Sequence, residues 1–381
     1  MTDDPNAPDR DRQPSFIAEV THLGRWVPSV DLFALFTLMP VPVLVLGCLF
    51  GGVFAWAGLI WIAGLIHVLD RLIRRAAPDA PEGSEFPAAD SLSIALGVAH
   101  FAVLALAVIA VVGLTGLGIV ERIVVFLGCG MFLGQVSNPN AHELIHRADK
   151  RLFTLGKWIY ISLLYGQHVS AHRLVHHRYV ATRDDPNTAV LGESFWAYLR
   201  QVWPGEFRAG WRAEQALRAR RSATQVQGWR GWLGPYAHYL AGGLAGIMLV
   251  WIAFGLMAVA VYVLLCLYAQ IQILLADYVQ HYGLERRRVA DSYEPVSVLH
   301  SWDAPDPVSA LWMLNAPRHS DHHAHPARPY PLLALGDYRA PGRPVLPYSL
   351  PVMATLALSP RIWHRLMDRR VKQLRARQAE L

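Results

Sequence analysis

The chain has 381 residues, of which 53% are hydrophobic, and its mean hydropathy is +0.25. A soluble domain carries about 45–50% apolar residues. The excess here lies in long uncharged runs, which excludes an ordinary soluble protein and indicates an integral membrane protein. The three cysteines, Cys48, Cys129 and Cys266, form no CxxC pair. Their spacing argues against a disulfide framework, a thiolate zinc site and a built-in iron–sulfur centre.

Residues 1–30 are mostly polar and of mixed charge. They lack the basic start and the short apolar core of a cleaved signal peptide. We therefore expect a disordered cytoplasmic tail.

Six apolar runs follow, each close to the roughly 20 residues that a helix needs to cross the hydrocarbon core. They cover residues 31–50, 52–70, 92–114, 119–138, 237–256 and 258–279. Short connections join them into three hairpins. The sequence therefore predicts an all-α integral membrane protein, with six transmembrane helices within residues 31–281 and a C-terminal region over 282–381.

Positive charge gathers on one side of the predicted hairpins. Arginines follow the second span, fill the long loop 141–236, and recur through the C-terminal region 282–381. Because positive residues mark the cytoplasmic side, we expect that loop, the C-terminal region and both termini to lie in the cytoplasm. The formal net charge of +6 then belongs to loops at an anionic membrane surface. No nucleic-acid-binding motif accompanies it, so nucleic acid is not an expected partner.

Nine of the 17 histidines lie in four clusters beside these spans. The clusters are His142 and His146 in HELIHR; His172, His176 and His177 in HRLVHH; His281 in QHYGL; and His319, His322 and His323 in RHSDHH. Neutral imidazole is a common nitrogen ligand of transition metals, and one tetrahedral site takes about four ligands. Nine histidines therefore suggest two metal ions. The expected topology places all four clusters on one face of the membrane, where they can converge.

The spacing within the clusters is helical. His142 and His146 are four residues apart, and so are His172 and His176, which puts each pair on one face of a helix. His177 would then be turned by about 100°. The spacing predicts that one helix supplies two or three ligands to one metal ion.

Further side chains are candidates for orienting a metal-bound imidazole: Asp277, Asp321, Glu143 and His300. Asp277 lies one helical turn before His281, and a carboxylate on a metal-bound imidazole is a common arrangement. The run Asp184–Pro186 after the second cluster fits either a loop turn or a brace of the site. His168 and His325 adjoin clusters and are additional candidates.

Histidine with little or no thiolate suits zinc, copper or iron. The spacing alone admits oxygen chemistry on a lipid-soluble substrate and also zinc-dependent hydrolysis. A hydrolase would need one zinc with three or four ligands, and a metal transporter would place its ligands along a path through the spans. Nine histidines gathered at one face favour the oxygenase.

The strings HELIHR, HRLVHHRYVATRDDPNTAVLGES, VQHYGL and NAPRHSDHHAHPARPYPLL resemble the membrane alkane monooxygenases, from about residue 30 to residue 370. The resemblance implies a bacterial inner membrane enzyme with a cytoplasmic non-haem di-iron site, whose two iron ions are held by the nine clustered histidines. It also implies hydroxylation of the terminal methyl of an n-alkane to a primary alcohol with O₂. Electrons would come from rubredoxin and an NADH-dependent rubredoxin reductase.

Some positions depart from that family. Ile145 stands where glycine is common, Gln280 where glutamate is frequent, Asp277 where asparagine is frequent, and SWDAPD where SWNSNH is often found. No departure removes a ligand, but together they change the shape and charge around the site. The histidine pattern is shared with fatty-acid desaturases, sterol hydroxylases and xylene monooxygenases, and HELIHR is closer to the last. A xylene-type aromatic-methyl monooxygenase or a fatty-acid desaturase or hydroxylase is therefore the alternative.

Two surfaces follow from this hypothesis. An alkane dissolves in lipid, so we expect a tunnel from the bilayer, with Trp56 and Trp61 as candidate lining residues. Since no flavin or haem motif is visible, an external acidic carrier should dock on positive charge by electrostatic steering. The candidate arginines are Arg218, Arg220, Arg221, Arg286, Arg287 and Arg288.

Overall fold

The computed structural model describes residues 29–73, 76–222 and 234–380. Residues 1–28 of the expected N-terminal tail lie outside this range. Within the described part the regular secondary structure is helical apart from one short antiparallel pair, β1 (Arg288–Val289) and β2 (Ser292–Tyr293).

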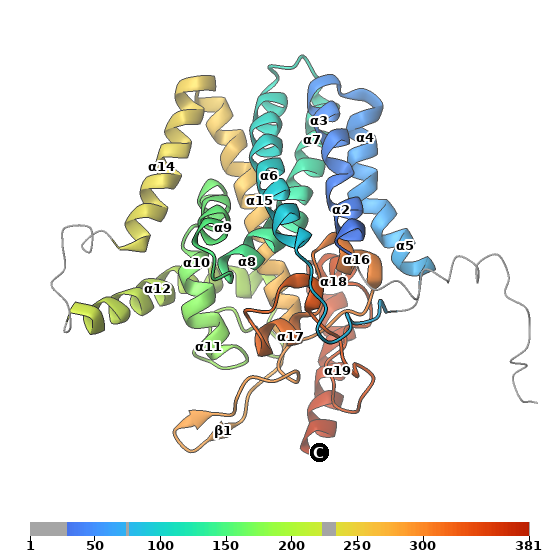
Figure 1. The fold of residues 1–381 in the computed structure, drawn as a ribbon, viewed down its shortest axis with the longest axis vertical. Coiled ribbons are helices and arrows are strands. Elements are labelled where there is room, and N and C mark those ends of the chain that lie inside the picture. The colour runs from blue at the N-terminus through green and yellow to red at the C-terminus, as the bar shows by residue number, and fades with distance from the viewer. Residues whose placement is uncertain (1–28, 74–75, 223–233, 381) are drawn as a thin grey trace, which may run out of the picture.

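Six helical segments are long and apolar enough to cross a membrane, and they confirm the six predicted spans. They are Val30–Phe50, Gly52–Leu72, Ala88–Val112, Ile119–Ile145, Pro235–Phe254 and Leu256–His281. They form the upper part of the molecule in Figure 1. The fourth segment ends at residue 145 rather than at 138, so the helix that crosses the membrane also carries the first histidine cluster.

Three of the spans are single helices, and the other three are each divided into consecutive helical elements. In chain order these are α2 (Val30–Leu38), α3 (Pro40–Phe50), α4 (Gly52–Ile60), η2 (Trp61–Leu65), α5 (Ile66–Leu72), α6 (Ala88–Val112), α7 (Ile119–Phe132), η3 (Leu133–Ser137), α8 (Asn138–Ile145), α14 (Pro235–Phe254) and α15 (Leu256–His281). Both η2 and η3 are π-helical turns. Gly51, at φ +61°, makes the tight turn of the first hairpin, and Glu121 of α7 accepts a hydrogen bond from the next amide, Gly52 N, at 2.6 Å.

The remaining elements gather beneath one end of the spans (Figure 1). Before the fifth span lie α9 (Lys150–Ser162), α10 (His168–Ala171), η4 (His172–His176), α11 (His177–Tyr179) and α12 (Phe195–Ser222). After the sixth span and the β1–β2 pair lie α16 (Pro307–Trp312), α17 (His319–Ala324), the 3₁₀ turn η5 (Tyr330–Leu332), α18 (Leu350–Ala357) and α19 (Pro360–Ala379). Helix α18 packs on α15, and α16 packs on α2 and α5. The C-terminal region is therefore docked onto the ends of the spans.

Helices α7 and α15 approach closely where glycines face large side chains. A methyl group added at Gly130 would overlap the ring of Tyr268. That ring is stacked on Phe126 with centroids 5.8 Å apart, so it has little room to move. Beside it, Gln272 Nε2 donates a hydrogen bond to the Gly130 carbonyl at 2.9 Å.

Gly130→Ala should therefore lower the free energy of unfolding by about 1–3 kcal/mol, the usual cost of overfilling a packed core. Thermal unfolding of the purified protein in detergent measures the change. Gly64→Ala is the matched control, because its new methyl would meet Ile60 at an ordinary 3.8 Å. Equal melting temperatures for the two variants would contradict the tight α7–α15 contact.

Candidate metal centre

The nine clustered histidines come together at the end of the helical bundle, in two adjacent groups. The first, here called the five-histidine site, contains His142, His146, His172, His177 and His322. The second, the four-histidine site, contains His176, His281, His319 and His323. Within each group the potential ligand nitrogens all lie within 4.8 Å of one another. Each group could hold a metal ion.

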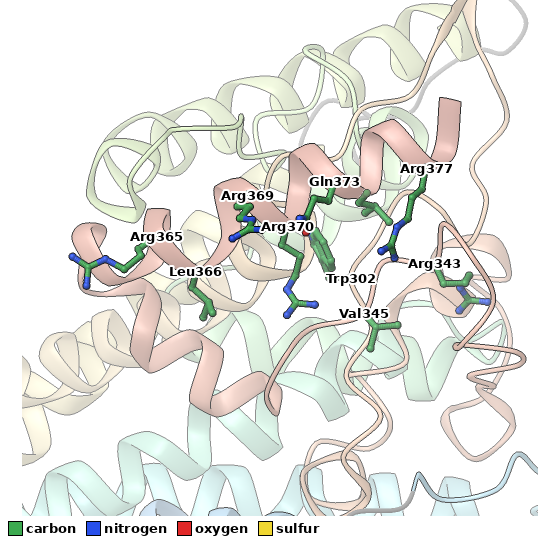
Figure 2. A pocket seen from close by; sticks show the side chains of 10 residues that line it. Trp302, Arg343, Val345, Arg365, Leu366, Arg369, Arg370, Gln373 and Arg377 are labelled. Atoms are coloured by element: carbon green, nitrogen blue, oxygen red, sulfur yellow. The ribbon is translucent and has the colours of Figure 1, made fainter. Parts of the chain in front are cut away.

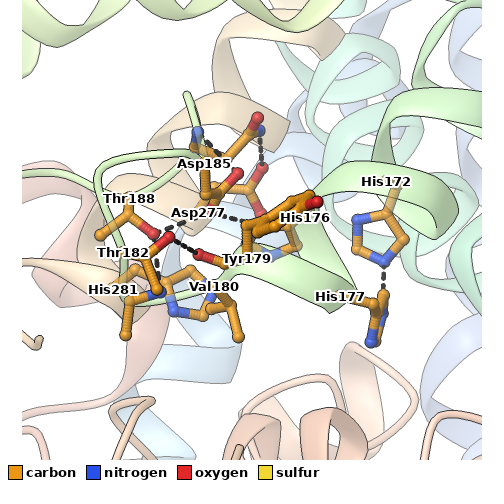
Figure 3. A network of polar contacts seen from close by, with 12 residues as sticks. His172, His176, His177, Tyr179, Val180, Thr182, Asp185, Thr188, Asp277 and His281 are labelled. Atoms are coloured by element: carbon orange, nitrogen blue, oxygen red, sulfur yellow. Dashed lines mark hydrogen bonds and ion pairs between the residues drawn. The ribbon is translucent and has the colours of Figure 1, made fainter. Parts of the chain in front are cut away.

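The second cluster divides between the two sites in a way that helical spacing does not predict. The Nε2 atoms of His177 and His172 lie 2.9 Å apart in the five-histidine site (Figure 3), while His176 belongs to the other site. The expected pairing of His172 with His176 is therefore wrong. Residues His172–His176 form the π-helix η4, in which i→i+5 hydrogen bonding brings residues five apart onto one face.

Helix α17 divides in the same manner. His319 and His323 are four residues apart and share the four-histidine site, whereas His322 enters the five-histidine site. The rings of His177 and His323 stack across the boundary with centroids 4.5 Å apart. Because η4–α11 and α17 each serve both sites, the two positions are held next to each other by the same short helices.

The arrangement of the nitrogens fits bound cations. His319 Nε2 lies 3.0 Å from His281 Nε2 and 3.1 Å from His323 Nε2, although three imidazole nitrogens cannot all satisfy one another with hydrogen bonds. His176 Nε2 and His146 Nε2 are buried without a hydrogen-bond partner among the described residues. Lone pairs aimed at one small volume repel unless a cation occupies it, so the donor set suits a nitrogen-binding transition metal.

Burial sets the charge state of these ligands. It lowers the pKa of His146 and of five other histidines, with a further lowering from neighbouring imidazoles: His172, His177, His319, His322 and His323. They are therefore neutral near pH 7, which is the form that binds metal. His176 differs: burial lowers its pKa, but the carboxylates of Asp185, Asp277 and Glu206 together raise it above its ordinary value.

Asp185 is the carboxylate that orients a clustered imidazole. Its Oδ2 lies 2.8 Å from His176 Nδ1 and accepts from Thr188 Oγ1 at 2.7 Å. Asn187 follows, and its Nδ2 donates to Asp277 Oδ2 at 2.9 Å. The network leaves His176 Nε2 directed to the site, so the Asp184–Pro186 run contributes a brace through Asp185.

The four side chains proposed to orient ligands occupy different positions. Asp277 bonds Asn187, and the side-chain atom nearest to His281 Nδ1 among its hydrogen-bond partners is instead Ser301 Oγ, at 3.5 Å. The imidazole of His300 lies 3.2 Å from Glu294 Oε1.

The two acidic residues inside the clusters contact arginines. Asp321 accepts from Arg328 at 2.6 Å and lies 2.8 Å from His325 Nδ1. Glu143 lies 3.4 Å from Arg147. These contacts anchor the loop after α17 and the end of α8.

The sequence interpretation missed two buried carboxylates. Glu206 of α12 lies 2.6 Å from His168 Nδ1, and the His168 ring packs 5.0 Å from the ring of His172. Asp303, within SWDAPD, accepts from Ser320 N at 2.9 Å and from Ser320 Oγ at 2.6 Å, which fixes the first turn of α17. Burial raises the pKa of Asp303 to about 6. Only the departure at SWDAPD marked Asp303 in the sequence, and nothing distinguished Glu206 from other acidic residues.

Asp185→Ala should weaken metal binding by about 10- to 100-fold at the four-histidine site, as loss of a ligand-orienting partner generally does. Asp184→Ala is the matched control, because Asp184 is exposed beside it. Metal titration of metal-free protein, followed by elemental analysis, measures both. Two tightly bound ions in Asp185→Ala would contradict the assigned role.

The comparisons with known proteins agree with this geometry. The sequence model of the fatty acid desaturase family matches residues 120–355, a range that contains all nine histidines. Alkane 1-monooxygenase 2 of Pseudomonas aeruginosa is 28% identical over 342 residues, covering 86% of both chains. Alkane 1-monooxygenase 1 of Alcanivorax borkumensis is 30% identical over 337 residues, covering 84% of this chain and 78% of the relative.

Proposed function

The chain belongs to the fatty acid desaturase family and, within it, to the alkane 1-monooxygenases, and we propose that it hydroxylates alkanes with O₂ at a metal pair held by the nine histidines. It is a multi-pass membrane protein. The observation that carries the proposal is the pair of adjacent all-nitrogen sites built on shared helices.

We propose iron as the metal in both sites. Nitrogen ligands suit zinc, copper and iron, but zinc has no redox chemistry and an alkane C–H bond is attacked only by an oxidant. When bound, the iron pair would activate O₂ for insertion of oxygen. One oxygen atom enters the C–H bond and the other leaves as water, which consumes two electrons and two protons in each turnover.

The protein's own part is to hold and shield the centre. All nine imidazoles are buried or half-buried, and the residues around them exclude bulk water. Asp185 fixes the orientation of His176. This rigidity keeps the unreactive substrate at one distance from the oxidant, which is the main lever a protein has over such chemistry.

A cavity near the first cluster provides a route for a lipophilic substrate. It measures about 160 Å³, lies between η3, α15 and α18, and is lined by apolar side chains such as Met131, Ile271 and Leu350. Asn138, one turn before His142, also lines it. The expected lining residue Trp56 is 47% exposed on the outside of α4, where it faces lipid. We therefore assign alkane entry to this cavity.

Ala354→Trp should fill the cavity and lower turnover of octane about tenfold or more without loss of metal, since the indole would occupy the substrate's place. Val352→Trp introduces the same side chain on α18 at a position that does not line the cavity. Product formation and metal content are compared for the two variants. Equal turnover would place substrate entry elsewhere.

Two further parts of the proposal are the electron donor and the side of the membrane on which the histidine sites lie. We propose that a rubredoxin and its NADH-dependent reductase supply electrons. The histidine sites lie on the same side of the bundle as the arginine-rich regions, which supports a cytoplasmic site in a bacterial inner membrane. Terminal hydroxylation of an n-alkane is the reaction we expect.

Elemental analysis of the purified protein, together with an octane assay containing O₂, NADH, rubredoxin and its reductase, tests the function. We expect about two iron ions per chain and 1-octanol as product. A benzylic alcohol from xylene without octanol would assign an aromatic-methyl substrate, and an alkene from an acyl lipid would assign a desaturase. Stoichiometric zinc with no reductant-dependent product would contradict oxygenase chemistry.

A further inference from the structure

A groove of about 420 Å³ lies along one face of α19 (Figure 2). Arg343, from the loop before α18, lines it together with four exposed arginines of α19: Arg365, Arg369, Arg370 and Arg377. None of the ten described residues that line it is acidic. Such a cluster attracts an acidic partner and accelerates its association.

Trp302 forms part of the groove wall and bonds to both neighbours of a clustered histidine. Its backbone N–H donates to the Gln280 carbonyl at 2.8 Å, and its indole N–H donates to the Tyr282 carbonyl at 2.9 Å. Residue His281 lies between these two, and Ser301 Oγ is 3.5 Å from His281 Nδ1. The groove is thus joined to a ligand of the four-histidine site by one buried aromatic side chain and one hydrogen bond.

A second connection reaches the same site. Arg343 donates to Asp303 Oδ2 at 2.9 Å, and Asp303 accepts from Ser320, the residue after His319. His281 is therefore linked to the groove through Trp302, and His319 is linked to it through Asp303 and Arg343. Neither connection leads to a histidine of the five-histidine site.

We propose that the α19 groove docks the acidic face of a one-electron carrier protein and that electrons enter the four-histidine site through Trp302. The proposal rests on the proposed function. Each docking oxidises one carrier by one electron, and two dockings supply the two electrons that reduce O₂ to one alcohol oxygen and one water. Figure 1 shows α19 extending away from the spans, which favours a protein partner over lipid headgroups.

The arginines expected from the sequence lie elsewhere and are partly engaged. Arg286 donates to the Glu294 and Arg178 carbonyls, and Arg287 pairs with the Glu294 carboxylate at 3.0 Å. The side chain of Arg221 falls outside the described residues. Arg288 is exposed in β1. It is the residue of this expected arginine set that is mutated in the experiment below.

The first test measures binding of purified rubredoxin to the full chain in nanodiscs, with and without metal, at low and high salt. The double variant Arg369→Glu/Arg370→Glu should weaken binding about tenfold or more and remove most of its salt dependence. Lys372→Glu is a charge-reversal control on the same helix outside the groove, and Arg288→Glu tests the alternative surface. Unchanged binding in the double variant would overturn the proposal, as would a larger loss in Arg288→Glu. Preferential binding of the groove to phosphatidylglycerol vesicles would also overturn it.

The second test separates docking from chemistry. With dithionite in place of rubredoxin, the double variant should form octanol at the wild-type rate. Trp302→Phe should slow reduction of the metal centre in stopped flow at saturating rubredoxin, a rate that does not depend on the affinity of docking. Wild-type reduction by rubredoxin in Trp302→Phe would overturn the Trp302 route. No product from the wild type with either reductant would contradict the proposed function, while the binding data would still decide whether the groove is the docking surface.

Discussion

Gathering nine buried or half-buried imidazoles around two small volumes is the constraint on which the rest of the structure depends. Nitrogen lone pairs directed at one point repel each other, and burial removes the water that would otherwise screen them. A cation at the centre of each group would relieve this repulsion, and contacts to the other side of a ring hold it in place. The spans and the C-terminal region are arranged so that both can occur at one end of the bundle.

The rigid part of that arrangement comes from hydrogen bonds made away from the metal positions. Asp185 holds His176, and Asp303 fixes the turn that starts α17. Each of these partners comes from a loop or short helix that would be unstable alone. Their order depends on packing under the spans, as where α16 and α18 contact α2, α5 and α15. The membrane bundle is therefore the scaffold that positions the loop-built histidine sites, as precise chemistry at a bound metal would require.

The sequence predicted what depends on local pattern and missed what depends on tertiary contact. Six spans followed from uninterrupted apolar length, and the nine clustered histidines followed from residue type and short spacing. The division into groups of five and four did not follow, because η4 is π-helical and changes which residues share a face. Glu206 could not be found either, since it reaches His168 from a helix 38 residues further along the chain. The carboxylate expected at His281, Asp277, bonds an asparagine instead.

The two sites differ in what surrounds them, and this difference suggests a division of labour. The four-histidine site is tied to Trp302 and Asp303, and through them to the basic groove on α19. The five-histidine site begins at His142, one turn from Asn138 in the wall of the apolar cavity. An alkane arriving from the bilayer would thus meet one metal position, while an electron arriving from a carrier would reach the other. The shared helices η4–α11 and α17 keep the two positions adjacent, so the electron need not cross the substrate's path. That separation would let a bulky carrier protein serve a centre whose substrate side must stay closed to water.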